Sequence, residues 1–165
     1  MEWSEVVEHP ALRDLPFKIE LNEFGEIVMT PGKVSHSMYR GEIGNLLQTR
    51  RLEGACLMNC AIKTRRGTKV ADVAWASSDR MALIRDEAEA SVAPQICVEI
   101  VYAKREMNAK KKLYFESGAE EVWFCNEHGD MTFYAPKNRI ERSNLFPDFP
   151  YLTSQTFCAS QLRSD

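Results

Sequence analysis

Two apolar stretches that each carry one carboxylate constrain the fold of this chain more than any other feature. Asp72 lies inside residues 70–75 and Glu99 lies inside residues 96–101, and both stretches are otherwise apolar with several β-branched side chains. Such stretches are typical of strands buried inside a sheet. A buried carboxylate without a partner is unfavourable, so it is usually ion-paired, protonated or bound to a cation. The pattern favours a shared cation, with the alternative that one strand lies at a sheet edge and exposes its carboxylate to water.

Size and composition favour one soluble globular domain over residues 1–165. The 165 residues suffice for a substantial core, and 44% hydrophobic with 27% charged residues is an ordinary balance for a soluble protein. No apolar stretch approaches the length of a membrane span, and residues 1–10 are too acidic and polar for a signal peptide. We therefore expect a cytoplasmic protein that does not contact a membrane.

The five cysteines predict free thiols rather than disulfides or a zinc site. Most of them lie in apolar stretches, and their number is odd. In a cytoplasmic chain this indicates reduced, buried thiols. Cys56 and Cys60 have no second Cys or His pair at the spacing that a structural zinc requires.

The order of periodic and apolar segments predicts an α/β fold, with a central mixed β-sheet flanked by helices and preceded by an N-terminal β-hairpin. Helices are expected at residues 3–12, 35–51, 79–89 and 105–116, and strands at residues 17–21, 26–29, 55–64, 69–76, 96–102, 121–125 and 131–134. Ser35 is the expected N-cap of the second helix. Strand, helix and strand in succession over residues 96–125 imply a right-handed parallel crossover. The aromatic residues at 144–157 are expected to pack against the body or a partner subunit.

Basic side chains gather in three stretches, although the formal net charge is −3. The stretches lie at residues 50–51, 63–69 and 104–112, and solvated surface is the ordinary explanation for any one of them. Together they also fit a basic rim that attracts phosphates around an acidic metal centre. The residues expected to contact nucleic acid are Arg65, Arg66, Lys69, Lys104 and Lys111.

The two carboxylates suit the chemistry of phosphodiester hydrolysis. That reaction needs an activated water, stabilisation of negative charge and help for the leaving oxygen, and carboxylate-bound Mg²⁺ can supply all three. Asp72 and Glu99 can hold such an ion if their strands are neighbours with both side chains on one face. Glu106 and Lys110 lie four residues apart on one face of the following helix, where a lysine can orient water or neutralise charge. The alternative for Glu106 and Lys110 is an ordinary surface ion pair.

In combination, these segments resemble the Uma-type restriction endonuclease family, long catalogued as a domain of unknown function within the PD-(D/E)XK nuclease superfamily. The resemblance begins near residue 19, covers most of the chain and is strongest at residues 93–101, 106–114 and 118–123. It implies a restriction-endonuclease-like fold and cleavage of DNA that depends on Mg²⁺, with Mn²⁺ as a substitute. It also suggests a homodimer.

The resemblance implies roles for particular residues. Asp72 matches the motif aspartate and Glu99 the motif acid, so both are implied as catalytic metal ligands. The superfamily lysine usually follows that acid by two positions, where this chain has Val101. Lys110 is implied as the catalytic lysine instead, from its place four residues before Tyr114. Four further candidates are Glu20 and Glu42 as additional metal ligands and Glu106 and His36 as supporting residues.

The chain departs from the family pattern directly after the Glu99 strand. The family usually has Ser-Pro-Ser there, whereas this chain has Tyr102, Ala103 and Lys104 after Val101, and Gln95 replaces a usual acid. This loop is expected to border the site, so the departure implies altered specificity or lost activity. Lys104 is an alternative source of the positive charge.

Two functions other than a nuclease therefore stay open. One is a catalytically inactive nucleic-acid-binding or assembly module on the same fold, for which salt-dependent DNA binding is expected. The other is a structural or regulatory oligomer without a nucleic-acid role, for which divalent cations should not raise the melting temperature.

Overall fold

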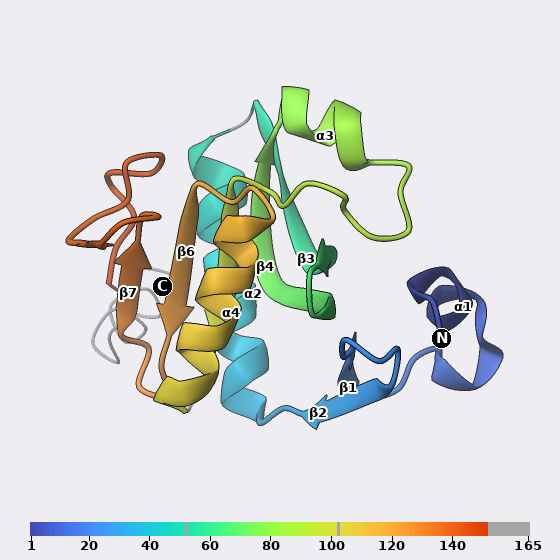
Figure 1. The fold of residues 1–165 in the computed structure, drawn as a ribbon. Coiled ribbons are helices and arrows are strands. Elements are labelled where there is room, and N and C mark those ends of the chain that lie inside the picture. The colour runs from blue at the N-terminus through green and yellow to red at the C-terminus, as the bar shows by residue number, and fades with distance from the viewer. Residues whose placement is uncertain (52, 102, 152–165) are drawn as a thin grey trace.

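The computed structural model describes residues 1–51, 53–101 and 103–151. Figure 1 shows a central sheet with α4 in front of it and α2 behind it, and a separate β1–β2 hairpin at the lower end. The elements in chain order are α1 (Trp3–Glu8), a 3-10 turn (Pro10–Leu12), β1 (Phe17–Leu21), β2 (Ile27–Pro31), α2 (Val34–Arg50), β3 (Gly54–Thr64), β4 (Gly67–Ser77), α3 (Ser78–Ile84), β5 (Ile96–Ile100), α4 (Lys104–Glu116), β6 (Glu121–Cys125), β7 (Met131–Tyr134) and β8 (Arg139–Ile140).

The central sheet is mixed and has six strands in the order β3-β4-β5-β6-β7-β8. β5 and β6 are parallel, while the other neighbouring pairs are antiparallel. α4 connects β5 to β6, which is the parallel connection that the sequence predicts. Every residue of β5 and of β6 is buried, because helices or loops cover both faces of the sheet at its centre.

Two apolar clusters, one on each face, hold the helices to this sheet. Behind the sheet, Ile43 and Leu47 of α2 pack with Trp75 and its neighbours. In front of it, Tyr114 of α4 packs with Phe124. Burial of these side chains is the main favourable contribution to folding. From this side, Lys110 and Tyr114 of α4 reach Glu99 of β5.

The β1–β2 hairpin forms a two-stranded sheet of its own and lies against the start of β4. Lys69 Nζ donates to the Leu21 carbonyl at 3.2 Å. Gly67 has a φ of +86°, and a Cβ atom there would lie 2.3 Å from the carbonyl oxygens of Leu21 and Asn22. Glycine therefore allows the hairpin backbone to approach β4 closely. Since a lone hairpin is at best marginally stable, these contacts fix its position.

The structure confirms the predicted α/β fold class, and several element boundaries differ from the predicted ones. The helix predicted over residues 3–12 is divided into α1 and a 3-10 turn, and the short strand β8 was not predicted. The strand predicted to end at residue 102 ends at Ile100. α2 begins before Ser35, because the Lys33 N–H donates to His36 Nδ1 at 3.1 Å and Lys33 becomes the N-cap. α3 ends at Ile84 rather than at residue 89, because the chain turns away over residues 85–91.

Other expectations concern the cysteines, the tail and the membrane. Cys97 and Cys125 are buried free thiols, and Cys56 and Cys60 are half-buried free thiols. Cys158 and residues 152–157 of the aromatic tail lie outside the described residues. Within the part of the chain that is described, no helix has both the length and the apolar character to cross a membrane.

Candidate functional site

Asp72 and Glu99 meet on the face of the sheet that α4 covers. β4 and β5 are antiparallel, and Val73 pairs with Val98. Asp72 precedes Val73 and Glu99 follows Val98, so the two acids lie opposite each other on the neighbouring strands. The Ile100 N–H donates to Asp72 Oδ2 at 2.8 Å, which ties the aspartate to the neighbouring strand. Both residues are buried, with 8% of Asp72 and 1% of Glu99 exposed. The two conditions for a shared ion, neighbouring strands and side chains on one face, are therefore met.

α4 supplies two partners to one oxygen of Glu99. Tyr114 Oη donates to Glu99 Oε1 at 2.5 Å, and Lys110 Nζ donates to the same oxygen at 3.1 Å. The two donors are four residues apart, so they project from one face of the helix. The fully buried Tyr114 fixes the glutamate, and the half-buried Lys110 places a positive charge beside it.

The hairpin supplies the other partner of these carboxylates, Lys18. Its Nζ lies 2.7 Å from Glu99 Oε2 and 3.2 Å from Asp72 Oδ1, so one ammonium group bridges both acids. Only 16% of the Lys18 side chain is exposed. The pattern in the sequence did not single out this residue.

Glu20 of the same strand joins the cluster through Lys110. Glu20 Oε1 accepts from Lys110 Nζ at 2.5 Å and from the Val70 N–H at 2.8 Å. Glu20 and Lys18 are two residues apart, so both side chains leave the same face of β1. The docked hairpin thus adds a third carboxylate and a second lysine to the pair from β4 and β5.

The two central acids have opposite electrostatic environments. Burial would raise the pKa of Glu99, but the ammonium groups of Lys110 and Lys18 outweigh it and hold that pKa at about 2. Burial, followed by the charge on Glu99, raises the pKa of Asp72 to about 6. Burial would lower the pKa of Lys18, yet Glu99, Asp72 and Glu20 together raise it far above its usual range. Lys18 is therefore a charged ammonium at any ordinary pH.

The chemistry of this donor set fits a divalent cation. One oxygen from each of two buried carboxylates points at a single position, which a nitrogen cation occupies here. Carboxylate oxygens are the ligands that Mg²⁺ and Mn²⁺ prefer, and Mg²⁺ commonly binds through one or two carboxylates while it keeps several waters. In the described residues no group of three or more His, Cys, Asp and Glu side chains is arranged to hold a metal ion. Asp72 Oδ1 and Glu99 Oε2 are the two carboxylate oxygens that face this shared position.

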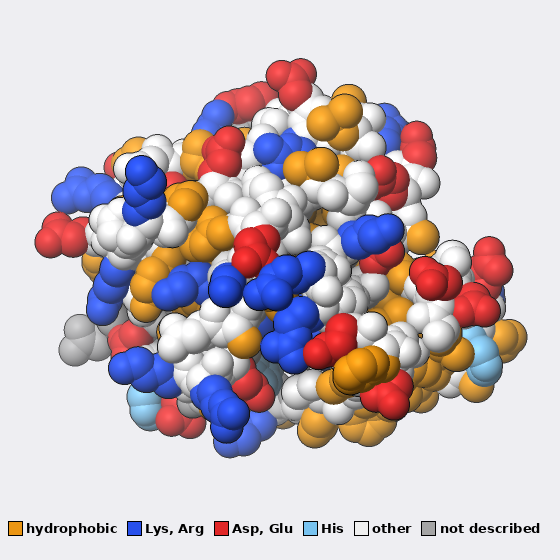
Figure 2. Space-filling view, viewed as in Figure 1, with side chains coloured by type: hydrophobic (Ala, Val, Ile, Leu, Met, Phe, Trp, Pro, Cys, Tyr) orange, Lys and Arg blue, Asp and Glu red, His pale blue; other side chains and the backbone are white. Residues whose placement is uncertain are grey.

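The cluster lies in the wall of a cleft of about 940 Å³ between the hairpin, α1, α2 and the sheet. Basic side chains also line this cleft, among them Arg40, Arg66 and Lys69, together with the acidic side chains of Asp14, Glu23 and Glu106. Figure 2 shows Lys and Arg side chains gathered across the middle of the molecular face between α4 and the β3–β4 turn. A chain with a formal charge of −3 thus presents a locally basic surface beside its buried acids.

Several of the predicted supporting residues also line the cleft. His36 is half-buried there; burial lowers its pKa, which a hydrogen bond with the Ile100 backbone partly offsets. Glu106 is exposed on α4 and lines the cleft without an ion pair to Lys110 in the described residues. Burial likewise lowers the pKa of Lys69. Arg66 lines the cleft and forms an ion pair with Glu23 at 2.8 Å.

Four other predicted residues lie elsewhere. Glu42 does not line the cleft, because it is two positions after Arg40 and therefore about 200° further around α2. Arg65 forms an exposed ion pair with Glu116 at 2.5 Å. Lys111 packs its ammonium over the Tyr134 ring, 4.1 Å from the centroid, and Lys104 is exposed at the start of α4.

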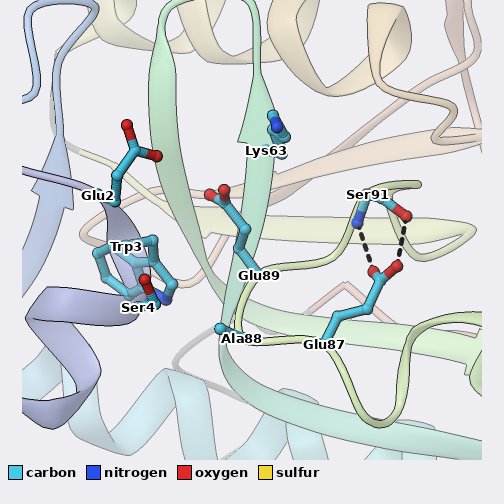
Figure 3. A pocket seen from close by; sticks show the side chains of 8 residues that line it. All are labelled: Glu2, Trp3, Ser4, Lys63, Glu87, Ala88, Glu89 and Ser91. Carbon is cyan, nitrogen blue, oxygen red and sulfur yellow. Dashed lines mark hydrogen bonds between the residues drawn. The ribbon is translucent and has the colours of Figure 1, made fainter.

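A second, smaller hollow of about 340 Å³ lies between α1 and the loop that follows α3. Figure 3 shows Trp3 and Lys63 at its wall and Glu87 turned toward Ser91. Glu87 accepts from the Ser91 N–H and hydroxyl, both at 2.7 Å, so its carboxylate is already used to close the turn. The larger cleft, and not this hollow, therefore holds the residues that are candidates for catalysis.

A family model and a solved structure relate this arrangement to known proteins. The model of the Uma2 family, described as “Putative restriction endonuclease”, matches residues 3–157. The chain belongs to this family. The family resemblance deduced from the sequence is confirmed, and the family description supports a nuclease.

The fold is also similar to that of a solved structure from Anabaena variabilis, described as a “putative nuclease belonging to DUF820”. The two chains share 13% sequence identity with a TM-score of 0.69, and the match covers 93% of this chain and 94% of that chain. At this level of identity the match shows a shared fold. No curated protein matches the chain.

Proposed function

We propose that this Uma2-family chain is an endonuclease that hydrolyses DNA phosphodiester bonds and depends on Mg²⁺, with Mn²⁺ as a substitute. The convergence of Asp72, Glu99 and Lys110 in a cleft that Arg40, Arg66 and Lys69 also line is the observation that carries the proposal. A divalent ion held by Asp72 and Glu99 supplies Lewis acidity and an activated water when it is bound.

The chain's own residues perform the other tasks. Lys110 places a positive charge beside Glu99, where it can stabilise negative charge that develops on the scissile phosphate. Tyr114 and the Ile100 N–H fix one oxygen of each carboxylate, which leaves Glu99 Oε2 and Asp72 Oδ1 directed toward a common position. Arg40, Arg66 and Lys69 along the cleft attract and orient the phosphate backbone.

Plasmid cleavage tests this proposal. We expect the full chain to nick or linearise supercoiled DNA in Mg²⁺ or Mn²⁺, and EDTA to stop the reaction. Asp72→Asn and Lys110→Met should each lower the rate by roughly 100-fold, since the first removes a charged metal ligand and the second a positive charge that stabilises the transition state. Lys137→Met is a matched control, because Lys137 is exposed in the β7–β8 turn and does not line the cleft.

Equal cleavage by wild type and Asp72→Asn, or no cleavage in any divalent metal, would contradict the nuclease. The second result would favour the alternative, a nucleic-acid-binding module without turnover. The bridge from Lys18 to both carboxylates is the observation that supports this alternative, because it neutralises the acids in the absence of a metal. Such a module should bind DNA with an affinity that falls steeply as salt rises.

A further inference from the structure

The two central carboxylates each use one oxygen for the protein scaffold and direct the other at Lys18. Asp72 Oδ2 accepts from the Ile100 N–H, and Glu99 Oε1 accepts from Tyr114 and Lys110. Asp72 Oδ1 and Glu99 Oε2 then share the Lys18 ammonium, at 3.2 and 2.7 Å. The lysine therefore sits at the point on which the two acids converge.

We propose that Lys18 is a resident counter-cation that positions Asp72 and Glu99 in the metal-free chain and leaves this point when a divalent cation binds. The inference rests on the proposed function, because it concerns the same two carboxylates as metal ligands. It makes Lys18 a positioning residue, and it predicts that Lys18 weakens the affinity for the metal.

Distance and charge both oppose the presence of the Lys18 ammonium and a divalent ion between these two oxygens at the same time. Mg²⁺ binds carboxylate oxygens at about 2.0–2.1 Å, so an ion shared by these two oxygens would lie within about 5 Å of the present position of Nζ. Two like charges at such a separation also repel strongly in a buried site. Three carboxylates, of Glu20, Asp72 and Glu99, face the ammonium groups of Lys18 and Lys110. Exchange of one ammonium for a divalent ion neutralises the single negative charge that remains.

The fold gives Lys18 a way out of the site. It lies on β1 of the hairpin, outside the central sheet, and its side chain lines the cleft. A lysine has a flexible four-carbon stem, so Nζ can swing into the cleft while the hairpin stays docked. Glu20 and Lys69 keep β1 against β4 through hydrogen bonds that do not involve Lys18. Withdrawal of the ammonium therefore does not require the sheet to open.

Calorimetric titration of the full chain with Mn²⁺ tests the proposal. Mn²⁺ binding that persists in Asp72→Asn belongs to other sites and is subtracted, so that only binding at this site is compared. We expect Lys18→Met to bind Mn²⁺ at least about tenfold more tightly than wild type, since a competing charge is lost. Lys18→Arg keeps the charge and should bind no more tightly than wild type, and the remote Lys137→Met should match wild type.

Equal or weaker Mn²⁺ binding by Lys18→Met would overturn the inference and leave the nuclease intact, provided that wild type binds the metal. Absence of such binding in both proteins would overturn the proposed metal-dependent function and this inference with it. Lys18→Met leaves two buried carboxylates short of a cation, which lowers stability.

A measurement on wild type covers the case in which Lys18→Met does not fold. The side-chain ¹⁵N signal of the Lys18 ammonium, identified by its absence in Lys18→Arg, should be present without metal because the group is held between two acids. Saturating Mg²⁺ should shift or remove that signal. An unchanged Lys18 signal at saturating Mg²⁺ would overturn the inference.

Discussion

At the residue scale, the surroundings of the site shift the pKa values of two neighbouring acids in opposite directions. Glu99 is held ionised by Lys110, Lys18 and Tyr114, whereas burial and the charge on Glu99 raise the pKa of Asp72 to about 6. The pair is thus electrostatically strained when both acids are ionised. A pair of this kind has a strong preference for a nearby cation, whether an ammonium or a metal.

The raised pKa of Asp72 predicts a specific pH dependence of stability in the metal-free protein. The pKa of Asp72 rises from 3.8 to about 6 on folding. The contribution of this residue to the free energy of unfolding is therefore complete below pH 3.8 and is lost as pH rises through 6. The asparagine side chain in Asp72→Asn cannot ionise, so this variant does not lose stability at this position as pH rises. The variant should therefore gain stability relative to wild type by up to about 3 kcal/mol between pH 4 and pH 7.5.

Urea unfolding in EDTA at several pH values measures this difference. Asp86→Asn is the control, because the Asp86 side chain is 95% exposed. Parallel stability curves for wild type and Asp72→Asn would show that Asp72 is not strained by folding.

Some site residues could be predicted from the sequence and others could not. Asp72 and Glu99 were predictable because a carboxylate inside an apolar strand needs a partner wherever the strand lies. Lys18 belongs to a short alternating strand, and its partners are set by tertiary docking that local pattern does not encode. The one available signal was the position of Lys18 two residues before Glu20, which puts both side chains on the same face of the strand.

Glu121 shows the limit of the same reasoning. It is another buried carboxylate at an apolar strand, with 2% exposed, but it serves the structure. It accepts from Trp123 Nε1 at 2.8 Å, from the Ser143 hydroxyl at 2.6 Å and from the Asn144 N–H at 2.7 Å. A buried acid thus indicates a partner, and the structure is needed to show which kind.

At the element scale, the hairpin decides whether the site is complete, because β1 contributes both Lys18 and Glu20. Its docking depends on the close approach at Gly67, which has a φ of +86°. A methyl group there would lie 2.3 Å from two backbone carbonyl oxygens. The hairpin itself was predictable from alternation and its glycine-containing turn, whereas its contact with β4 was not.

Gly67→Ala should therefore lower the free energy of unfolding by about 1–3 kcal/mol, since both the backbone conformation and the hairpin contact oppose a side chain. Gly41→Ala is the matched control. Gly41 lies within α2, and a Cβ there meets no atom within 4 Å, so alanine should raise stability by up to about 1 kcal/mol. Urea midpoints compare the two, and a Gly67→Ala protein as stable as wild type would contradict the account of the docking.

At the scale of the whole molecule, the predicted α/β architecture and the family are both confirmed, because strand periodicity and the β5-α4-β6 connection leave few alternatives. The cleft was not predictable, since it forms where a separate hairpin meets the sheet. The homodimer stays a prediction. So does the effect of the loop at residues 101–104, of which Tyr102 lies outside the described residues.

The central claim is that Asp72 and Glu99 converge on a point that a divalent cation takes when Lys18 leaves it. A crystal structure of the full chain with Mn²⁺, measured for anomalous scattering, tests this claim most directly. We predict an anomalous peak in contact with Asp72 Oδ1 and Glu99 Oε2, with Lys18 Nζ moved into the cleft. Lys18 still bridging both carboxylates at saturating Mn²⁺, without a peak beside them, would contradict it.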